Sequence, residues 1–234
     1  MRGLLKEEYE EYEKTYEQPV RQGLRLNRCK ITGEAWEYIC PFPGEKIPWV
    51  SNGYYIEKEQ EQLPSRHPYY FAGLYYLQEP SAMTPASRLP IEKGDYVLDL
   101  CAAPGGKATE LAGRLAGTGL LFANDLSSSR AKALLKNLEL TGAPNIYVTS
   151  ETPEKLTENL PGFFDKVLID APCSGEGMFH KEPRMMKYWE EQPPAYYAGI
   201  QKNLILLGAE MLRPGGMLLY STCTFSLEEN EEVI

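Results

Sequence analysis

The sequence lacks any long hydrophobic run, and no apolar segment approaches the roughly 20 residues that a transmembrane helix needs. Its first residues, MRGLLKEEYEEYEKTYEQP, are charged and rich in tyrosine, so they do not resemble the apolar core of a signal peptide. We therefore expect a cytoplasmic protein that has no membrane partner.

Cysteine and histidine are also scarce. The five cysteines form no CxxC pair, and the two histidines, His67 and His180, lie far apart in the chain. An odd number of scattered cysteines is typical of reduced thiols rather than of a disulfide framework. The sequence therefore predicts neither disulfides nor a bound metal.

Positive charge is in deficit, with 24 lysines and arginines against 33 acidic residues and a formal net charge of −9. Taken alone, this balance argues against a nucleic-acid partner, because phosphate contacts usually need a basic surface. Six of the acidic residues lie close together between residues 7 and 17, however, in a stretch that we interpret as a solvated helix face. Basic residues recur elsewhere, at Arg66, Arg88, Lys181, Arg184 and Lys187. The acidic total therefore does not exclude RNA.

The 234 residues suffice for one sizeable domain with a smaller extension. Residues 1–90 are rich in tyrosine, glutamate and proline, and they predict an initial helix followed by short strands at 23–31 and 53–58. We expect a small α+β N-terminal extension here, which is also a candidate RNA-contacting region. From residue 91 onward, apolar strands alternate with helices. This alternation predicts an α/β domain over 91–234 with a Rossmann-like, doubly wound and mostly parallel sheet.

The expected strands of this domain cover residues 96–102, 119–125, 145–151, 166–172 and 217–224. A helix from about Tyr196 to Leu212 should stop at the Pro-Gly-Gly of residues 214–216, and Ser226 with Glu229 fits a capping box that opens one more helix. Sheets of this kind normally contain further strands after such a helix. We therefore expect the domain to be truncated at its C-terminal end.

A glycine-rich turn follows the first of these strands. Its residues are Cys101, Ala102, Ala103, Pro104, Gly105, Gly106 and Lys107. Glycine lets the backbone approach a ligand, and the N-terminus of the next helix attracts an anion. Asp125 ends the second strand, 20 residues after Gly105 (125 − 105), where an acid can bind the ribose of an adenosine-type cofactor. A purely structural turn with a helix-capping aspartate is the alternative, and we favour cofactor binding.

Two cysteines lie at the ends of consecutive strands. Asp170 and Cys173 close the fourth strand, and Cys223 closes the fifth. Adjacent strands should bring both cysteines and Asp170 into one pocket beside the cofactor. A cysteine is most often a small buried hydrophobe, but two of them in polar Gly/Ser/Thr settings favour a function. Cys29 and Cys40 are expected to be structural.

Three motifs now identify a resemblance. DLCAAPGGKATELA, DAPCSGEGMF and YSTCTFSLEENE closely resemble the motifs of the Nop/Sun family of RNA cytosine-5 methyltransferases. The segments HPYYFAGLYYLQEPSAM and ETPEKL are most similar to bacterial members that act on small-subunit rRNA. The similarity runs from about Tyr16 to Ile234. It implies a class I methyltransferase fold, S-adenosylmethionine as cofactor and RNA, most of all rRNA, as partner; it implies no obligate protein partner.

The resemblance also assigns roles to the strand-end residues. Carbon 5 of cytosine is too weak a nucleophile to take a methyl group unless a thiolate first adds at carbon 6. Cys223 would be that nucleophile, Asp170 would bind the ring edge at N3, and Cys173 would assist breakdown of the adduct. The target base would have to leave its stack to reach the pocket.

On the cofactor side, the resemblance assigns the loop of residues 101–107 to the methionine end and Asp125 to the ribose. Family members commonly carry an acid near the adenine, where this sequence has Thr152 with Glu151 beside it. Glu151 is therefore the candidate adenine contact. Arg130 is a candidate for pairing with an acid near the site, and a solvated helix arginine is the alternative. Aromatic and basic residues that suit RNA interleave between 179 and 189, namely Phe179, Lys181, Arg184 and Trp189.

Other functions remain open on this sequence. A Rossmann oxidoreductase would share the glycine turn and the ribose acid, but it should show GxGxxG and would not need two strand-end cysteines. A non-catalytic RNA-binding ribosome-assembly factor could keep the fold, although intact Cys223, Cys173 and Asp170 argue against it. A tRNA cytosine-5 methyltransferase and a small-molecule methyltransferase would share the fold as well.

Overall fold

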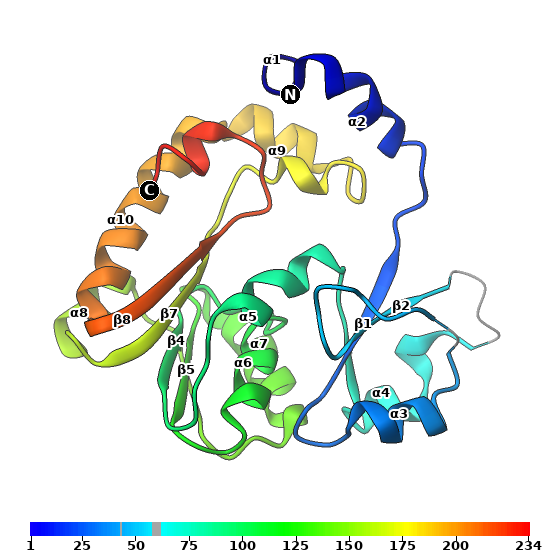
Figure 1. Cartoon of the computed structure of the whole chain (residues 1–234). Helices are drawn as coiled ribbons and strands as arrows, with labels where there is room; N and C mark the ends of the chain where they lie inside the picture. Colours follow the sequence, from blue (N-terminus) through cyan, green and yellow to red (C-terminus); the bar gives the residue numbers. More distant parts are fainter. Residues whose placement is uncertain (43, 58–61) are drawn as a thin grey trace. The chain divides into compact units, whose positions relative to one another are not determined.

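The computed structural model describes residues 1–42, 44–57 and 62–234 (Figure 1). These residues form two compact units. The first unit comprises Met1–Arg21, Pro172–Lys202 and Thr222–Ile234, and the second comprises Gln22–Ala171 and Asn203–Ser221. None of the helices in the described ranges is long and apolar enough to cross a membrane.

A five-stranded parallel sheet forms the centre of the second unit. Its strands are β4 (Tyr96–Asp99), β5 (Leu120–Asn124), β6 (Ile146–Thr149), β7 (Phe164–Asp170) and β8 (Leu212–Ser221). They are ordered β6-β5-β4-β7-β8, and every pairing is parallel. Val97 and Leu98 point to opposite faces and are both fully buried, which explains why the strands are apolar throughout.

Helices cover both faces of this sheet. They are α5 (Thr84–Arg88), α6 (Ala108–Leu115), α7 (Ser128–Thr141), α8 (Pro153–Asn159) and α10 (Pro194–Met211). One core cluster joins α6 and α7 to the sheet through Leu111 and Leu134, and Figure 1 shows these two helices beside β4 and β5. A second cluster on the other face includes Leu156 of α8 and Met211 of α10. The expected doubly wound, Rossmann-like α/β architecture is confirmed.

A smaller antiparallel sheet belongs to the same unit. Its strands are β1 (Gln22–Leu26), β2 (Gly53–Ile56) and β3 (Tyr75–Leu77), in the order β2-β1-β3. Four short helical segments accompany it: α3 (Gly33–Ile39), η2 (Pro64–Arg66), α4 (Pro68–Phe71) and η3 (Ser81–Met83). Trp36 is the largest fully buried side chain in its core. The expected strand at 53–58 is present as β2, with Lys58 outside the described residues.

The strand predicted at 23–31 is shorter than expected. β1 ends at Leu26, because the next residue turns the chain. The side-chain amide of Asn27 donates to the carbonyls of Gly73 and Thr141, at 2.8 and 3.0 Å. These partners lie far away in the sequence, so periodicity could not reveal the turn.

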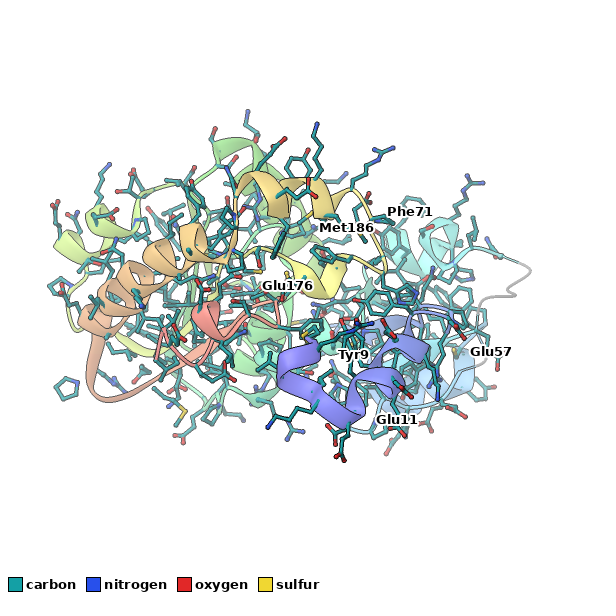
Figure 2. The ribbon with its side chains drawn as sticks, turned by 90° about the horizontal axis from the view of Figure 1, so that it is seen from above. Tyr9, Glu11, Glu57, Phe71, Glu176 and Met186 are labelled. Carbon is teal, nitrogen blue, oxygen red and sulfur yellow. The ribbon has the colours of Figure 1, made fainter. Side chains whose placement is uncertain are left out.

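The described helical elements of the first unit are short, apart from its share of α10. They are α1 (Arg2–Leu5), η1 (Lys6–Glu8), α2 (Tyr9–Thr15), η4 (Glu176–Met178), α9 (Met185–Glu191) and η5 (Leu227–Glu229). The ring of Tyr12 packs edge-on against Phe225, with centroids 6.0 Å apart. Tyr9 and Glu176, both labelled in Figure 2, line a cavity of about 900 Å³ in this unit.

Two predictions near the C-terminal end are wrong, the helix stop at residues 214–216 and the capping box at Ser226. The Pro-Gly-Gly of residues 214–216 does not separate a helix from a strand, because α10 ends at Met211 and β8 already begins at Leu212. The register shifts there, since Leu212 pairs with Phe164 while Met217 pairs with Lys166, so these residues form an irregularity in β8. Proline and glycine are tolerated in such bulges. β8 then ends at Ser221, before Cys223.

The capping box expected at Ser226 does not form. Ser226 makes no side-chain cap hydrogen bond, and only the short 3-10 helix η5 follows it. Glu229 instead turns inward and is fully buried. Its carboxylate therefore belongs to a different hydrogen-bond network, described below.

Candidate functional site

The glycine-rich loop, residues 101–107, connects β4 to α6. Gly105 has φ +112°, a conformation that favours glycine, and a Cβ at Gly106 would lie 2.9 Å from Nε2 of Gln78. Two side chains of α7 fasten the loop from outside: Asn137 donates to the Pro104 carbonyl at 2.7 Å, and Arg130 donates to the Ala103 carbonyl at 2.9 Å. These two hydrogen bonds hold the loop against α7.

The same loop offers unused hydrogen-bond donors. The backbone N–H groups of Gly106 and Lys107 immediately precede α6, and neither donates to another residue in the described part of the chain. The N-terminus of a helix carries a partial positive charge. The donor set therefore fits the carboxylate at the methionine end of an S-adenosylmethionine molecule.

Asp125 lies directly after β5 and is only 2% exposed. Its Oδ1 accepts from the Ser127 backbone at 3.0 Å, and its Oδ2 accepts from the Ala103 backbone at 3.3 Å. Nη2 of Arg130 lies 3.4 Å from the same Oδ2. Asp125 is therefore the acid with which Arg130 pairs. A carboxylate offers about four acceptor positions. With these three contacts made, Asp125 retains about one acceptor position, on Oδ1, for a ribose hydroxyl.

Glu151 is tied to the sheet through its backbone rather than through its carboxylate. Asn124, the last residue of β5, donates from its side chain to the Glu151 carbonyl at 3.0 Å and accepts from the Glu151 N–H at 3.0 Å. The Glu151 carboxylate pairs with Lys155 at 2.7 Å. Thr152 caps α8 by accepting from the Lys155 backbone. Sequence reasoning missed Asn124, although a polar residue at the end of a buried strand was a usable signal.

Asp99 is a buried acid that sequence reasoning also left without a role. It is fully buried at the end of β4, and neither carboxylate oxygen has a hydrogen-bond partner among the described residues. Burial, and next the charge of Asp170, raise the pKa of Asp99 to about 8, so this acid is protonated at neutral pH. It therefore adds no negative charge beside Asp125 and Asp170.

Cys101 is expected to be unreactive for a similar reason. Burial above all raises the pKa of the Cys101 thiol to about 12. The thiol is therefore protonated at neutral pH and is a poor nucleophile.

Asp170 ends β7 and is paired across the sheet edge with Ser221, the last residue of β8. Nζ of Lys107 donates to its Oδ2 at 2.6 Å, and Oγ of Ser221 donates to its Oδ1 at 2.8 Å. The Asp170 side chain is 33% exposed, so one edge of the carboxylate remains accessible. Lys107 thereby connects the glycine-rich loop with the acid at the end of β7.

The two strand-end cysteines come together in the first unit. Cys173 follows three residues after the end of β7, and Cys223 follows two residues after the end of β8. Their sulfur atoms lie 3.1 Å apart, and the Cys223 backbone N–H donates to the Cys173 sulfur at 3.3 Å. The hydrogen bond with Cys223, together with burial, raises the pKa of the Cys173 thiol. Cys173 is thus the member of the pair that keeps its proton, and Cys223 is exposed.

A buried carboxylate connects the two cysteine segments. Glu229 accepts from the Ser174 backbone at 2.8 Å, from the Ser174 hydroxyl, and from Nε2 of Gln201 at 3.1 Å. Gln201 also donates to the Pro172 carbonyl at 2.8 Å, and the Ser174 hydroxyl lies 2.9 Å from that of Thr224. Ser174 follows Cys173 in the sequence and Thr224 follows Cys223, so each cysteine lies next to a residue of this network. Sequence reasoning missed Glu229 because a capping box explained it locally.

Replacing Glu229 by alanine is expected to lower the free energy of unfolding by about 3 kcal/mol, because buried donors of Ser174 and Gln201 would lose their acceptor. Glu228→Ala, at the exposed neighbouring position, is the matched control and should change it by less than about 0.5 kcal/mol. Urea unfolding measures both changes. Equal effects of the two substitutions would contradict a linking role for Glu229.

The segment expected to contact RNA is only partly exposed. Lys181 and Arg184 are exposed, whereas Phe179 is half-buried and lines the cavity of the first unit. The indole nitrogen of Trp189 is buried without a hydrogen-bond partner among the described residues. RNA contact by this segment remains a prediction.

Comparison with known proteins gives concordant matches. Residues 86–234 match the family model for 16S rRNA methyltransferase RsmB/F, and residues 1–80 match the N-terminal domain of 16S rRNA methyltransferase RsmF. The ribosomal RNA small subunit methyltransferase F of Vibrio vulnificus (strain YJ016) is 38% identical over 93% of this chain and 47% of its own length. Its counterpart in Enterobacter sp. (strain 638) is also 38% identical, over 93% of this chain and 47% of its own length.

A solved structure gives the same result for the fold. A methyltransferase homolog protein from Pyrococcus horikoshii superimposes with a TM-score of 0.80 at 32% identity, covering 94% of this chain and 70% of the other. The chain spans about half the length of the curated relatives that it matches.

Proposed function

Because the chain belongs to the 16S rRNA methyltransferase RsmB/F family, we propose that it methylates carbon 5 of a cytosine in small-subunit rRNA, using S-adenosylmethionine. The observation that carries this proposal is the cysteine pair, with sulfur atoms 3.1 Å apart after the ends of the neighbouring strands β7 and β8. A reaction that needs one thiolate to attack and a second group to assist release explains why two cysteines are present.

Cys223 is the nucleophile in this proposal. It is the exposed member of the pair, and the raised pKa of Cys173 leaves the proton on the other sulfur. The Cys223 thiolate forms a bond to carbon 6 of the ring, which makes carbon 5 nucleophilic. The Cys173 thiol, at 3.1 Å, can donate a hydrogen bond to the Cys223 sulfur before the attack.

When the thiolate adds, N3 takes up a proton, which balances the one that Cys223 has lost, and Asp170 accepts a hydrogen bond from this N3–H while the adduct exists. Lys107 and Ser221 fix both of its oxygens, so the carboxylate is oriented before the base arrives. After methylation, carbon 5 must lose its proton before the bond between Cys223 and carbon 6 can break. Once the Cys223 sulfur is bonded to carbon 6, it no longer raises the pKa of Cys173, so the Cys173 thiol can release its proton to water and, as a thiolate, accept the proton of carbon 5. The electron pair of that C–H bond restores the ring double bond, the bond between Cys223 and carbon 6 breaks, and Cys223 leaves as a thiolate.

The cofactor is held by the second unit. The N–H groups before α6 would bind its carboxylate, and Asp125 would bind its ribose. When bound, S-adenosylmethionine supplies an electrophilic methyl group. Arg130 positions Asp125, and Glu151 remains the candidate for the adenine side.

Asp125→Ala is expected to weaken S-adenosylmethionine binding at least about tenfold, because hydrogen bonds to a charged acceptor contribute about 1.5–3 kcal/mol. Isothermal titration calorimetry measures this change. The matched control is Glu139→Ala, an acid at an exposed position of α7, which should leave the affinity unchanged. Heat of binding for NAD, with none for S-adenosylmethionine, would contradict the proposal and favour an oxidoreductase.

The reaction itself can be tested with methyl-labelled S-adenosylmethionine and purified RNA, followed by nucleoside analysis. We expect labelled 5-methylcytidine in small-subunit rRNA. Label confined to tRNA would favour a tRNA methyltransferase. Binding of rRNA without any label would favour a non-catalytic assembly factor.

A further inference from the structure

A pocket lined by basic residues lies in the second unit and contains none of the residues assigned above. Its cavity measures about 620 Å³. Its polar and aromatic lining comes from Arg28, Trp49, Ser51, Ser87, Arg88 and Arg114, and no carboxylate lines it. We call this site the basic pocket. Three arginines thus line one pocket in a chain whose net charge is −9.

Arg28 is fixed in the basic pocket. Its Nε donates to Oε1 of Glu110 at 2.8 Å, and its Nη2 donates to Ser51 and Asn52, both at 2.9 Å. Its stem crosses α6 at Gly113, where an added Cβ would lie 3.2 Å from Cβ of Arg28. Its Nη1 makes no hydrogen bond to any described residue and remains available.

Arg114 is oriented in the same way from α6. Its Nη1 donates to the carbonyls of Ala86 and Leu89, at 2.7 and 2.5 Å. The other two nitrogens of its guanidinium group, Nε and Nη2, make no hydrogen bond within the described ranges. A ligand would therefore find these donors already in place, which reduces the entropy lost on binding.

The positive charge of the basic pocket is not cancelled nearby. Glu110 is only 1% exposed and pairs with both Arg25, at 3.1 Å, and Arg28, at 2.8 Å. Its single charge therefore serves Arg25 and Arg28, and it also acts at longer range on Arg114. Arg88 and Arg114 pair with no acid in the part of the chain that the structure describes. The basic pocket thus keeps a net positive charge and suits an anion.

Trp49 adds an aromatic surface to this site. Its side chain is 38% exposed, its Nε1 donates to the Pro80 carbonyl at 3.4 Å, and its ring stands edge-on to Tyr55 with centroids 6.3 Å apart. An indole held in this way can stack on a nucleobase. A free phosphate ion would not use it.

We propose that the basic pocket binds a phosphate group of the RNA backbone and that an adjacent base stacks on Trp49. Guanidinium groups match phosphate oxygens in charge and geometry, and aromatic stacking accepts any base. The acidic remainder of the chain repels RNA, so binding at this pocket also orients the substrate. The identification of RNA as the ligand rests on the function proposed above. The charge and geometry of the pocket are independent of that function.

The test is a titration of the whole chain with fluorescently labelled single-stranded RNA at several salt concentrations, followed by anisotropy. Arg88→Gln should raise the dissociation constant about fivefold and reduce the salt slope by about 0.7, as expected for one lost phosphate contact on a single strand. Trp49→Leu should raise the dissociation constant at least about fivefold and leave the salt slope unchanged. Arg88 pairs with no described residue, so its replacement should not disturb folding.

Lys136→Gln is the matched control, because Lys136 is an exposed cation of α7 outside the basic pocket. Its dissociation constant and salt slope should equal those of the wild type. Equal values for Arg88→Gln and the control would overturn the proposal. A second result would also overturn it: inorganic phosphate competes with RNA, and Trp49→Leu leaves the dissociation constant for RNA unchanged. The pocket would then bind free anions only.

The same variants separate this proposal from the proposed function. At saturating RNA, Arg88→Gln and Trp49→Leu should methylate at the wild-type rate, because neither residue belongs to the methylation site. If the wild type binds RNA through the basic pocket but transfers no methyl group, the pocket stands and the proposed function fails. If methylation occurs but neither substitution changes RNA affinity, the pocket proposal alone fails.

Discussion

Cys223→Ala is expected to abolish methylation and every covalent protein–RNA species. Neither Cys173 nor Cys101 is suited to replace it. Cys173 keeps its proton, because the hydrogen bond with Cys223 and burial raise its pKa, and burial raises the pKa of Cys101 to about 12. A protonated thiol is a poor nucleophile. Methyl transfer should therefore fall to the background of the assay.

Cys173→Ala should have the opposite effect on the adduct. The nucleophile remains, so the bond between Cys223 and carbon 6 still forms, but the assistance to its breakdown is lost. A covalent protein–RNA band should therefore accumulate on denaturing gels. This band should be absent for Cys223→Ala and for the double variant.

Cys29→Ala is the control for both substitutions, since Cys29 is exposed and has no assigned role. It should behave like the wild type. A band trapped by Cys223→Ala but not by Cys173→Ala would reverse the two roles. If both variants merely lost stability and neither trapped RNA, the cysteines would be structural.

Asp170→Asn is expected to lower the rate of methyl transfer by about 10²–10⁴-fold, the range typical of a group that assists at the reacting ring. Asparagine keeps the shape of the side chain but removes the negative charge that Lys107 binds at 2.6 Å. The ring edge would lose an oriented, charged partner. Single-turnover kinetics at saturating RNA and cofactor isolate this step from binding.

Ser221→Ala is the milder comparison, because it removes one hydrogen bond of 2.8 Å to the same carboxylate and leaves the charge intact. We expect a loss of about tenfold or less. A wild-type rate for Asp170→Asn would contradict a role of this acid in the reaction. An effect confined to S-adenosylmethionine affinity would assign Asp170 to cofactor binding instead.

The architecture could be predicted from the sequence because local signals agree with the tertiary structure. Strands such as β4 are apolar on both faces, as burial within a parallel sheet requires, and the helices between them alternate in the expected order. The family motifs likewise lie at the ends of strands. Asp99 and Asp170 are the last residues of β4 and β7, and both belong to the motifs that identified the resemblance.

What could not be predicted depends on contacts between distant residues. Glu229 looked like part of a helix cap because Ser226 stands three positions before it, but its actual donors are Ser174 and Gln201. Residues 214–216 looked like a boundary, and instead they form an irregularity in β8 whose register is set by β7. The basic pocket joins residues between 28 and 114, and no local pattern links them.

The most direct test of the central claim is bisulfite sequencing of small-subunit rRNA from cells that lack the gene and carry either the wild-type sequence or Cys223→Ala. We predict one cytosine that resists conversion with the wild type and converts fully with Cys223→Ala. An rRNA in which every cytosine converts equally in both strains would contradict methylation at carbon 5 by this protein.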